Sequence, residues 1–164
     1  MKKFYLLVVT LFMIVAVKQS SAQSWTLDSS FNSTGINKFN FYNNIDRLFG
    51  SVLQPDQKLI VVGLSKNGSF FQLCVARFLV NGQLDTRFSN DGKAYIGMGN
   101  QGSIGGIKPN VKLDAAGKIV LVSSGRGTSS QDVLVARLNS NGTPDVSFNG
   151  TGSLFIDVLG TNTQ

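Results

Sequence analysis

Several residue types on which common active sites depend are absent or scarce in this chain. Its 164 residues include no histidine and one cysteine, and all nine acidic residues are aspartates. Without histidine there is no Ser-His-Asp or Cys-His relay and no zinc site built on imidazole. One cysteine excludes an internal disulfide and a CxxC pair. We therefore predict no catalytic, cofactor-binding or metal-binding residue and no cofactor, so the chain is not expected to be an enzyme.

Charge is also low, at 15% of the residues, whereas glycine is abundant with 18 residues. This composition is typical of strands joined by tight turns and not of helical bundles. Basic residues outnumber acidic ones by 15 to 9, but after Ala22 no three of them are consecutive. A nucleic-acid surface needs a cluster or a stripe of positive charge. We expect no nucleic-acid partner.

The N-terminal segment, residues 1–22, has the three-part pattern of a secretory signal peptide. Met1-Lys2-Lys3 is positive, residues 4–17 form an apolar run, and residues 18–22 end in small side chains before Gln23. A membrane-spanning helix needs about 20 apolar residues, more than this run contains, so a cleaved signal is favoured over an anchor. We expect export, a secreted or cell-surface location, and no membrane span after cleavage.

Two stretches of the chain align with each other without a gap, so that Val75 corresponds to Val135. Short motifs recur in the same order, and a third copy of the Asp-x-x-Phe-x-x-x-Gly motif occurs near the N-terminus. The repeated residues are Val75-Ala76-Arg77 and Val135-Ala136-Arg137, Asn81-Gly82 and Asn141-Gly142, then Asp28, Asp85 and Asp145, Phe31, Phe88 and Phe148, and Gly35, Gly92 and Gly152. Repeats of this length indicate solenoids, propellers or arrays.

The repeat divides the chain into a signal peptide and three units. The boundaries are residues 1–22 for the signal, 23–92 for the first repeat with its N-terminal partial motif, 93–152 for the second repeat, and 153–164 for the start of a third.

Each full unit contains four β-branched or aromatic-rich runs separated by turn residues. They are Ile36–Tyr42, Arg47–Leu53, Lys58–Leu64 and Phe71–Leu79 in the first unit, and Lys93–Met98, Val111–Asp114, Lys118–Ser123 and Val133–Asn139 in the second. Four strands make one propeller blade. The predicted fold class is all-β: consecutive four-stranded antiparallel blades of a β-propeller-like repeat, two blades plus the first strand of a third, in an incomplete ring.

One run in each unit is apolar on both faces, Leu59–Val62 in the first and Ile119–Val122 in the second. A sheet with one wet face alternates apolar and polar residues instead. Both faces of each sheet are therefore expected to be covered, and stacking on neighbouring units would cover them.

The repeated polar and glycine positions favour structural roles. We expect the Asn-Gly pairs to form type I′ hairpin turns, in which both central residues have positive φ. The repeated aspartates are expected to open turns and accept backbone N–H groups, and the glycines to adopt backbone conformations closed to other residues. The repeated phenylalanines are expected to pack one blade on the next. Arg77 and Arg137 each precede a repeated aspartate by eight positions, which predicts a scaffold ion pair.

Other motifs carry weaker signals. Gly97–Gly102 matches GxGxxG, but Ser103–Pro109 cannot start the helix that a dinucleotide site needs. Asn90-Asp91-Gly92 suggests a calcium loop, yet the closing glutamate is absent. The sequons at Asn32, Asn67, Asn141 and Asn149 arise readily in a turn-rich chain. Cys74 lies in an apolar run and is expected to be an inert core residue.

As a set, these motifs resemble the bacterial delta-60 repeat. The resemblance rests on Leu84-Asp85-x-x-Phe88-x-x-Asp91-Gly92, on Leu53-Gln54-Pro55-Asp56-x-Lys58 with the strand 59–63, and on Val75-Ala76-Arg77-Phe78-x-x-Asn81-Gly82. It covers residues 27–158 and implies a β-propeller-like repeat in exported bacterial proteins, usually without known catalysis. Gln57 replaces the turn glycine of the family in the first unit, and Ala115-Ala116 replaces its Pro-Asp in the second.

Propellers close with 4–8 blades, which is more than two units supply. The chain is therefore expected to be a fragment of a longer protein or to assemble several copies into one ring. Its partners would be further repeats of the same chain or a homo-oligomer, with a protein or a glycan as a further possibility. The leading hypothesis is a non-catalytic exported module with a structural or protein-interaction role. The alternatives are a carbohydrate-binding lectin formed by ring assembly and a propeller hydrolase whose site lies in further repeats.

Overall fold

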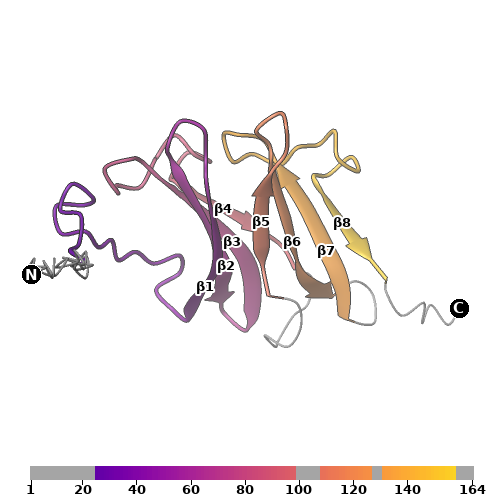
Figure 1. Ribbon diagram of the computed structural model, residues 1–164. Helices are drawn as coiled ribbons and strands as arrows, with labels where there is room; N and C mark the ends of the chain where they lie inside the picture. Colours follow the sequence, from indigo (N-terminus) through magenta and orange to yellow (C-terminus); the bar gives the residue numbers. More distant parts are fainter. Residues whose placement is uncertain (1–24, 99–107, 127–130, 158–164) are drawn as a thin grey trace, which may run out of the picture.

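The computed structural model describes residues 25–98, 108–126 and 131–157, which include two four-stranded β-sheets stacked face to face (Figure 1). The first sheet contains β1 (Asp46–Leu53), β2 (Leu59–Asn67), β3 (Phe70–Phe78) and β4 (Lys93–Ile96). The second contains β5 (Asn110–Leu113), β6 (Ile119–Arg126), β7 (Gln131–Leu138) and β8 (Ser153–Ile156). The predicted all-β fold of consecutive four-stranded antiparallel blades is confirmed.

Each sheet is an antiparallel meander in which strands that follow one another along the chain are neighbours. The pairing register repeats between the sheets. Val75 on β3 lies opposite Ala94 on β4, and Val135 on β7 lies opposite Leu154 on β8. The alignment of the two repeats in sequence is therefore a structural alignment as well, so corresponding residues occupy equivalent places.

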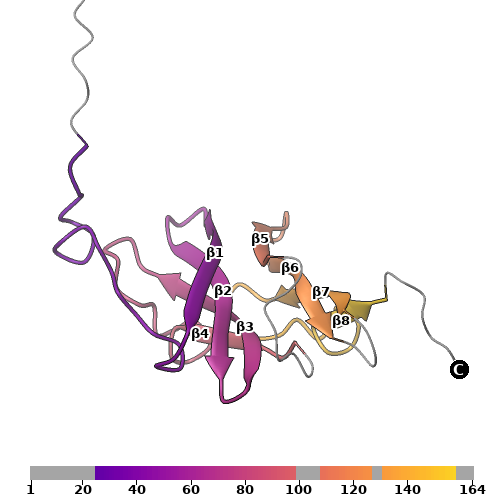
Figure 2. The ribbon, with the colours of Figure 1, turned by 90° about the horizontal axis from the view of Figure 1, so that it is seen from below.

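The two sheets face each other (Figure 2), and the main core lies between them. The first sheet contributes Ile60, Val62, Leu73 and Val75, and the second contributes Ile119, Leu121, Leu134, Ala136 and Leu138, all at most 2% exposed. A smaller cluster covers the opposite face of the first sheet, where Val61, Cys74, Ala76 and Phe78 pack beneath Phe39, Phe41 and Tyr42. β2 is thus buried on both faces, as its sequence predicts.

The sheets are out of phase with the sequence units. The sequence assigns the strand at Lys93 to the start of the second unit, but β4 pairs with β3 and completes the first sheet. Likewise Ser153–Ile156, predicted to open a third unit, pairs with β7 as the last strand of the second sheet. The shift arises because a sheet is defined by its hydrogen-bonded neighbours, whereas a repeat can be divided at any point of its period.

The predicted first strand, Ile36–Tyr42, is wrong. This segment forms no strand and instead runs along the first sheet, where Phe39 and Phe41 pack edge to face at a centroid distance of 5.2 Å. It follows Gly35 as β4 follows Gly92. Its pairing partner would be the third strand of a preceding sheet, and the described residues include no such strand.

The prediction of type I′ turns at the Asn-Gly pairs is also wrong. Gly82 and Gly142 have φ of +79° and +90°, but Asn81 and Asn141 do not have positive φ. Gly82 N donates to Leu79 O at 2.8 Å, and Leu79 N donates to Gln83 O at 2.8 Å. This is the three-residue loop in which a type I turn ends in a left-handed glycine.

Two sequence predictions fall outside the described residues. The expected signal peptide, residues 1–22, is one, and most of the GxGxxG motif is the other. Within the ranges that the structure describes, no helix is long and apolar enough to cross a membrane.

Candidate functional site

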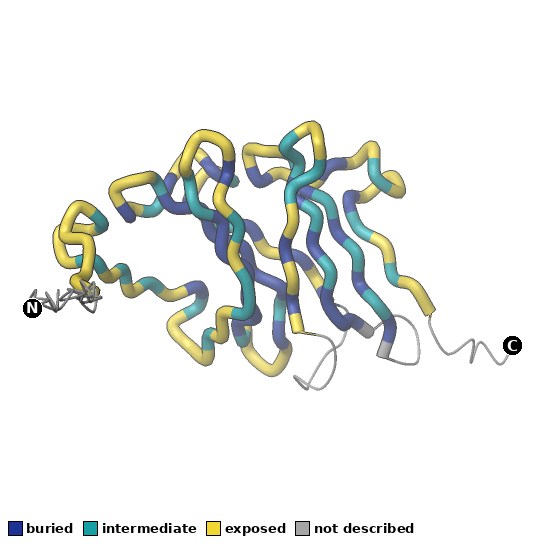
Figure 3. The backbone as a smooth tube through the Cα atoms, viewed as in Figure 1, coloured by how far each residue is buried: buried dark blue, intermediate teal, exposed yellow. Residues whose placement is uncertain are grey.

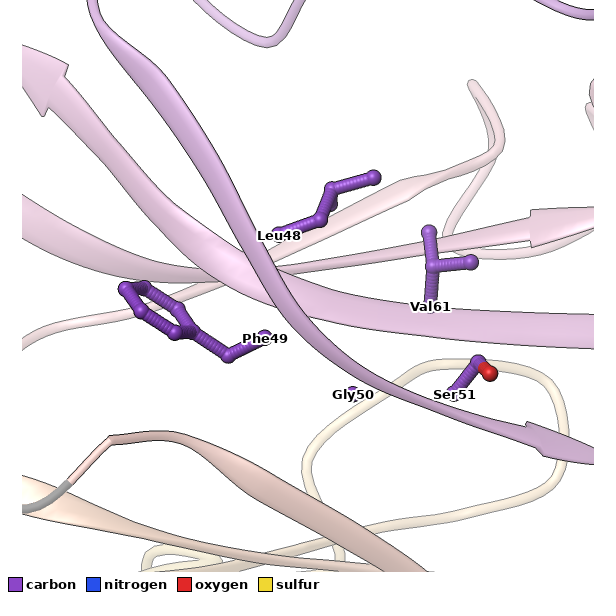
Figure 4. Close-up of a pocket in the computed structure, with 5 residues that line it drawn as sticks. All are labelled: Leu48, Phe49, Gly50, Ser51 and Val61. Atoms are coloured by element: carbon purple, nitrogen blue, oxygen red, sulfur yellow. The ribbon is translucent and has the colours of Figure 1, made fainter.

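The described residues form few clusters of the side chains that catalysis or metal binding requires. In that part of the chain no three Asp or Cys side chains gather in a group that could hold a metal ion. A shallow pocket beside β1 is lined by Leu48, Phe49, Gly50, Ser51 and Val61, and Leu48 and Phe49 lie on opposite sides of the strand (Figure 4). It holds no titratable side chain. The structural features that repeat lie elsewhere, at the joint between the sheets and on the outer face of the second sheet.

The joint between the sheets is centred on Arg77, at the end of β3. Its Nε donates to Asp85 Oδ2 at 2.9 Å, and its guanidinium carbon lies 4.8 Å from the centroid of the Phe88 ring. Its Nη1 donates to the carbonyl oxygen of Ser140, which belongs to the second sheet's turn. The predicted Arg–Asp pair is confirmed, and its arginine ties one sheet to the next.

Phe88 fills the space between the two sheets. It is completely buried, and a Cβ added at Gly142 would lie 2.8 Å from its ring. The adjacent Ser89 N donates to Asn141 O at 2.8 Å. The expected role of this phenylalanine, packing one blade on the next, is therefore confirmed.

The carboxylate of Asp85 organises the turn that carries Phe88. Its side chain accepts from Arg87 N at 3.2 Å and lies 3.4 Å from Lys58 Nζ. Burial raises the pKa of this carboxyl, but the Arg87 N–H bond and the charges of Arg77 and Lys58 outweigh burial and hold it below 3.8. The aspartate is therefore charged at neutral pH, and its carboxylate accepts from Arg77 and Arg87 within the joint.

The same cluster of arginine, aspartate, lysine and phenylalanine recurs in the second sheet, but its phenylalanine is partly exposed. Asp145 accepts from Lys118 Nζ at 2.7 Å and Arg137 Nε at 2.6 Å, and hydrogen bonds from Lys118 and Ser147 lower its pKa well below its usual value. The guanidinium carbon of Arg137 lies 5.0 Å from the centroid of the Phe148 ring. Phe148 is only half-buried, however, whereas Phe88 is completely buried.

Gly35, Gly92 and Gly152 have φ of +79°, +88° and +86°, which confirms that these positions favour glycine. The repeated aspartates accept backbone N–H groups as expected, Asp28 from Ser30 N at 2.9 Å and Asp145 from Ser147 N at 3.2 Å.

The outer face of the second sheet is apolar and incompletely covered. We call it the outer face and define it by Val120, Val122, Val133, Val135, Leu154 and Ile156, which alternate along their strands with the residues of the main core. Leu154 and Ile156 are 36% and 44% exposed, and the four valines are half-buried. Figure 3 shows the last strand mostly in the exposed and intermediate colours.

The equivalent face of the first sheet is fully covered. Its residues Ile60, Val62, Leu73, Val75, Ala94 and Ile96 are 0–9% exposed because the second sheet lies over them. The outer face thus has the apolar composition of the buried face of the first sheet, but its side chains are more exposed to solvent. Sequence reasoning found that both faces are apolar but could not show which face lacks its neighbour.

The predicted place of Cys74 in the core is confirmed. It is completely buried on the face of the first sheet that points away from the second sheet, in the cluster with Phe41 and Phe78, and burial raises the pKa of its thiol to about 12. At neutral pH it is a protonated, shielded core residue and not a nucleophile.

The fold and the repeated joint define a propeller-like repeat domain: four-stranded antiparallel sheets, stacked face to face, joined by an arginine, an aspartate and a phenylalanine. A protein-family model agrees. Residues 54–88 and 117–148 match a family described as "Domain of unknown function (DUF5122) beta-propeller". The two matches lie at equivalent places in the two repeats. Searches of curated proteins and of solved structures found no match.

Proposed function

We propose that this chain is a non-catalytic, exported module of the bacterial delta-60 type, and that it acts through protein interaction by adding sheets of the same repeat to its outer face. The observation that carries the proposal is the exposure of Leu154 and Ile156 at 36% and 44%, where Ala94 and Ile96 are 5% and 9% exposed. Stacked β-sheets bury such faces against one another. The partner is a further sheet of this repeat, in the same chain or in another copy.

The pattern of the partner follows from the existing joint. The face that packs on the first sheet carries Ile119, Leu121 and Leu134. Phe148 already lies against Arg137, and its open side has room for an Asn-Gly turn whose glycine has positive φ, of the kind that receives Phe88. A sheet of this repeat supplies both the apolar face and the turn.

Light scattering and a hydrophobic dye test this proposal. We expect the mature chain, residues 23–164, to associate with rising concentration and to bind anilinonaphthalene sulfonate. Val135→Lys, in the middle of the outer face, should abolish both while circular dichroism still reports β-structure. Val146→Lys is the matched control, because Val146 is 67% exposed and lies outside the outer face. A monomer without dye binding, unchanged by Val135→Lys, would contradict the proposal.

Export is proposed on the composition of residues 1–22. A fusion of residues 1–40 to leaderless alkaline phosphatase should be active in bacterial cells, since that enzyme needs an oxidising compartment. Leu11→Arg, which interrupts the apolar run, should abolish the activity. Equal activity of both fusions would contradict export through this segment.

A further inference from the structure

The segment Asp28–Phe39 repeats the end of each sheet. Asp28, Phe31 and Gly35 have the spacing of Asp85, Phe88 and Gly92, and residues 36–39 follow Gly35 as β4 follows Gly92. We call residues 28–39 the N-terminal arm.

The N-terminal arm lies against the first sheet as the end of the first sheet lies against the second. Asn32 N donates to Asn81 O at 2.7 Å, as Ser89 N donates to Asn141 O at 2.8 Å. A Cβ added at Gly82 would lie 2.8 Å from the Phe31 ring, the same separation that Gly142 would have from Phe88. The arm therefore occupies the place of the last turn and last strand of a preceding sheet.

Within the described residues, the arm lacks three contacts that the equivalent segments of the two sheets make: an arginine and a lysine beside the aspartate, and a guanidinium over the phenylalanine ring. Asp85 and Asp145 each have an arginine and a lysine partner, but the Asp28 carboxylate forms no salt bridge within the described residues and accepts from Ser30 N. Phe88 and Phe148 each lie under a guanidinium, and Phe31 lies under none of those that the structure places.

Among the described residues, no strand lies beside residues 36–39. β4 pairs with β3 and β8 with β7, whereas this part of the arm belongs to no strand. A shallow pocket lined by Asn32, Thr34, Ile36 and Lys38 opens along it. Ile36 is 48% exposed, although the equivalent strand ends lie within sheets.

We infer that the N-terminal arm is a second docking site, which receives the third strand of a further sheet of this repeat and thereby becomes that sheet's fourth strand. The incoming strand carries Val-Ala-Arg. Its arginine pairs with Asp28 and stacks on Phe31, and its arginine N–H donates to Gly35 O, as Arg77 N donates to Gly92 O at 3.1 Å. The carboxylate and the ring at fixed positions select an arginine-bearing strand over other apolar strands.

The register of the added strand follows from the two sheets. Ala76 lies opposite Lys93 and Ala136 opposite Ser153. The alanine of the incoming strand should therefore lie opposite Ile36, and its preceding valine opposite Asn37. The inference rests on the proposed function only in that the partner is the same repeat, because the arm and the outer face are separate surfaces.

A strand peptide tests the inference on the full mature chain. The probe is a fluorescent peptide with the sequence of residues 131–139, which contains the Val-Ala-Arg motif of β7. We expect saturable binding by anisotropy and slower amide exchange at residues 36–39. Arg137→Ala in the peptide, or Asp28→Asn in the protein, should weaken binding at least about tenfold, since a charge-assisted hydrogen bond is lost.

Asp28→Asn keeps an oxygen for the Ser30 N–H, so the turn should survive. The matched control is Asp91→Asn, because exposed Asp91 accepts from Lys93 N at 2.8 Å in a similar turn. Binding without protection at residues 36–39, or protection that Asp28→Asn leaves unchanged, would overturn the inference. Val135→Lys in the protein changes the outer face and leaves the arm intact. The variant should therefore still bind the peptide, even though it no longer associates through the outer face.

Discussion

The ring of Phe88, at the end of the first sheet, lies on Gly142 in the turn of the second. A Cβ at Gly142 would stand 2.8 Å from ring carbon Cε2, closer than real Cβ contacts come. One residue without a side chain thus admits one large side chain, and the contact sets how closely the two sheets approach. Phe31 and Gly82 repeat the relationship one unit earlier.

Gly142→Ala should destabilise the domain more than Gly117→Ala. Both glycines have positive φ, +90° and +75°, so both substitutions cost about 1 kcal/mol of backbone strain. No atom lies within 4 Å of a Cβ at Gly117. The clash with Phe88 should therefore add about 1–3 kcal/mol at Gly142 alone. Urea unfolding measures both variants, and equal losses would show that the ring does not press on this turn.

Arg77→Met should cost more than Arg137→Met. The Arg77 side chain is 8% exposed and contacts both sheets, whereas that of Arg137 is 27% exposed. Removing Arg77 leaves the buried Asp85 carboxylate with a weaker counter-charge and should cost about 3 kcal/mol. Arg137 is partly exposed, and Asp145 keeps Lys118 as a partner, so the loss of Arg137 should cost about 1 kcal/mol or less. Urea unfolding of the two variants gives the comparison, and a larger loss at Arg137 would contradict this description of the joint.

Stability should fall in acid. The folded pKa values of Asp85 and Asp145 lie below the ordinary value of 3.8, so these groups stabilise the fold above that pH. Their contribution is lost as the pH falls through the lowered folded values. Urea midpoints at pH 7, 5 and 3 should be nearly equal for the first two and lower for the third. Asp85→Asn should reduce the drop, and an unchanged drop would assign it to other carboxylates.

Cys74 should resist alkylation while the domain is folded. Its thiol is completely buried, and its pKa of about 12 leaves almost no thiolate at pH 8. We expect iodoacetamide to react at least about a hundredfold more slowly than with the urea-unfolded chain. Rates that stay high in native buffer would place the thiol at the surface.

The sequence predicted those parts of the fold that depend on composition and spacing. Glycine and aspartate positions identified turns, and the two-faced apolar run at Leu59–Val62 identified a stacked sheet. It also paired Arg77 with Asp85, since a turn between them brings residues eight apart together. Local pattern was enough for the turns and the ion pair because these contacts join residues close together in the sequence.

What the sequence did not predict depends on contacts between units. Ile36–Tyr42 has the composition of a strand, but a strand exists only beside another strand. The turn type at Asn81 was missed because type I′ and type I loops with a glycine bulge use the same residues. The uncovered state of the outer face has no sequence signal at all, since Val135 belongs to the same Val-Ala-Arg motif as Val75.

The measurement that tests the account most directly is the unfolding of a lengthened chain. A second copy of residues 97–156 placed after Ile156 would supply a further sheet for the outer face. The account predicts one cooperative urea transition with a higher midpoint and a larger slope, and predicts that Val135→Lys in the original copy removes the gain. An unchanged midpoint, with the added sheet unfolding separately, would contradict the claim that each sheet is built to be covered by the next.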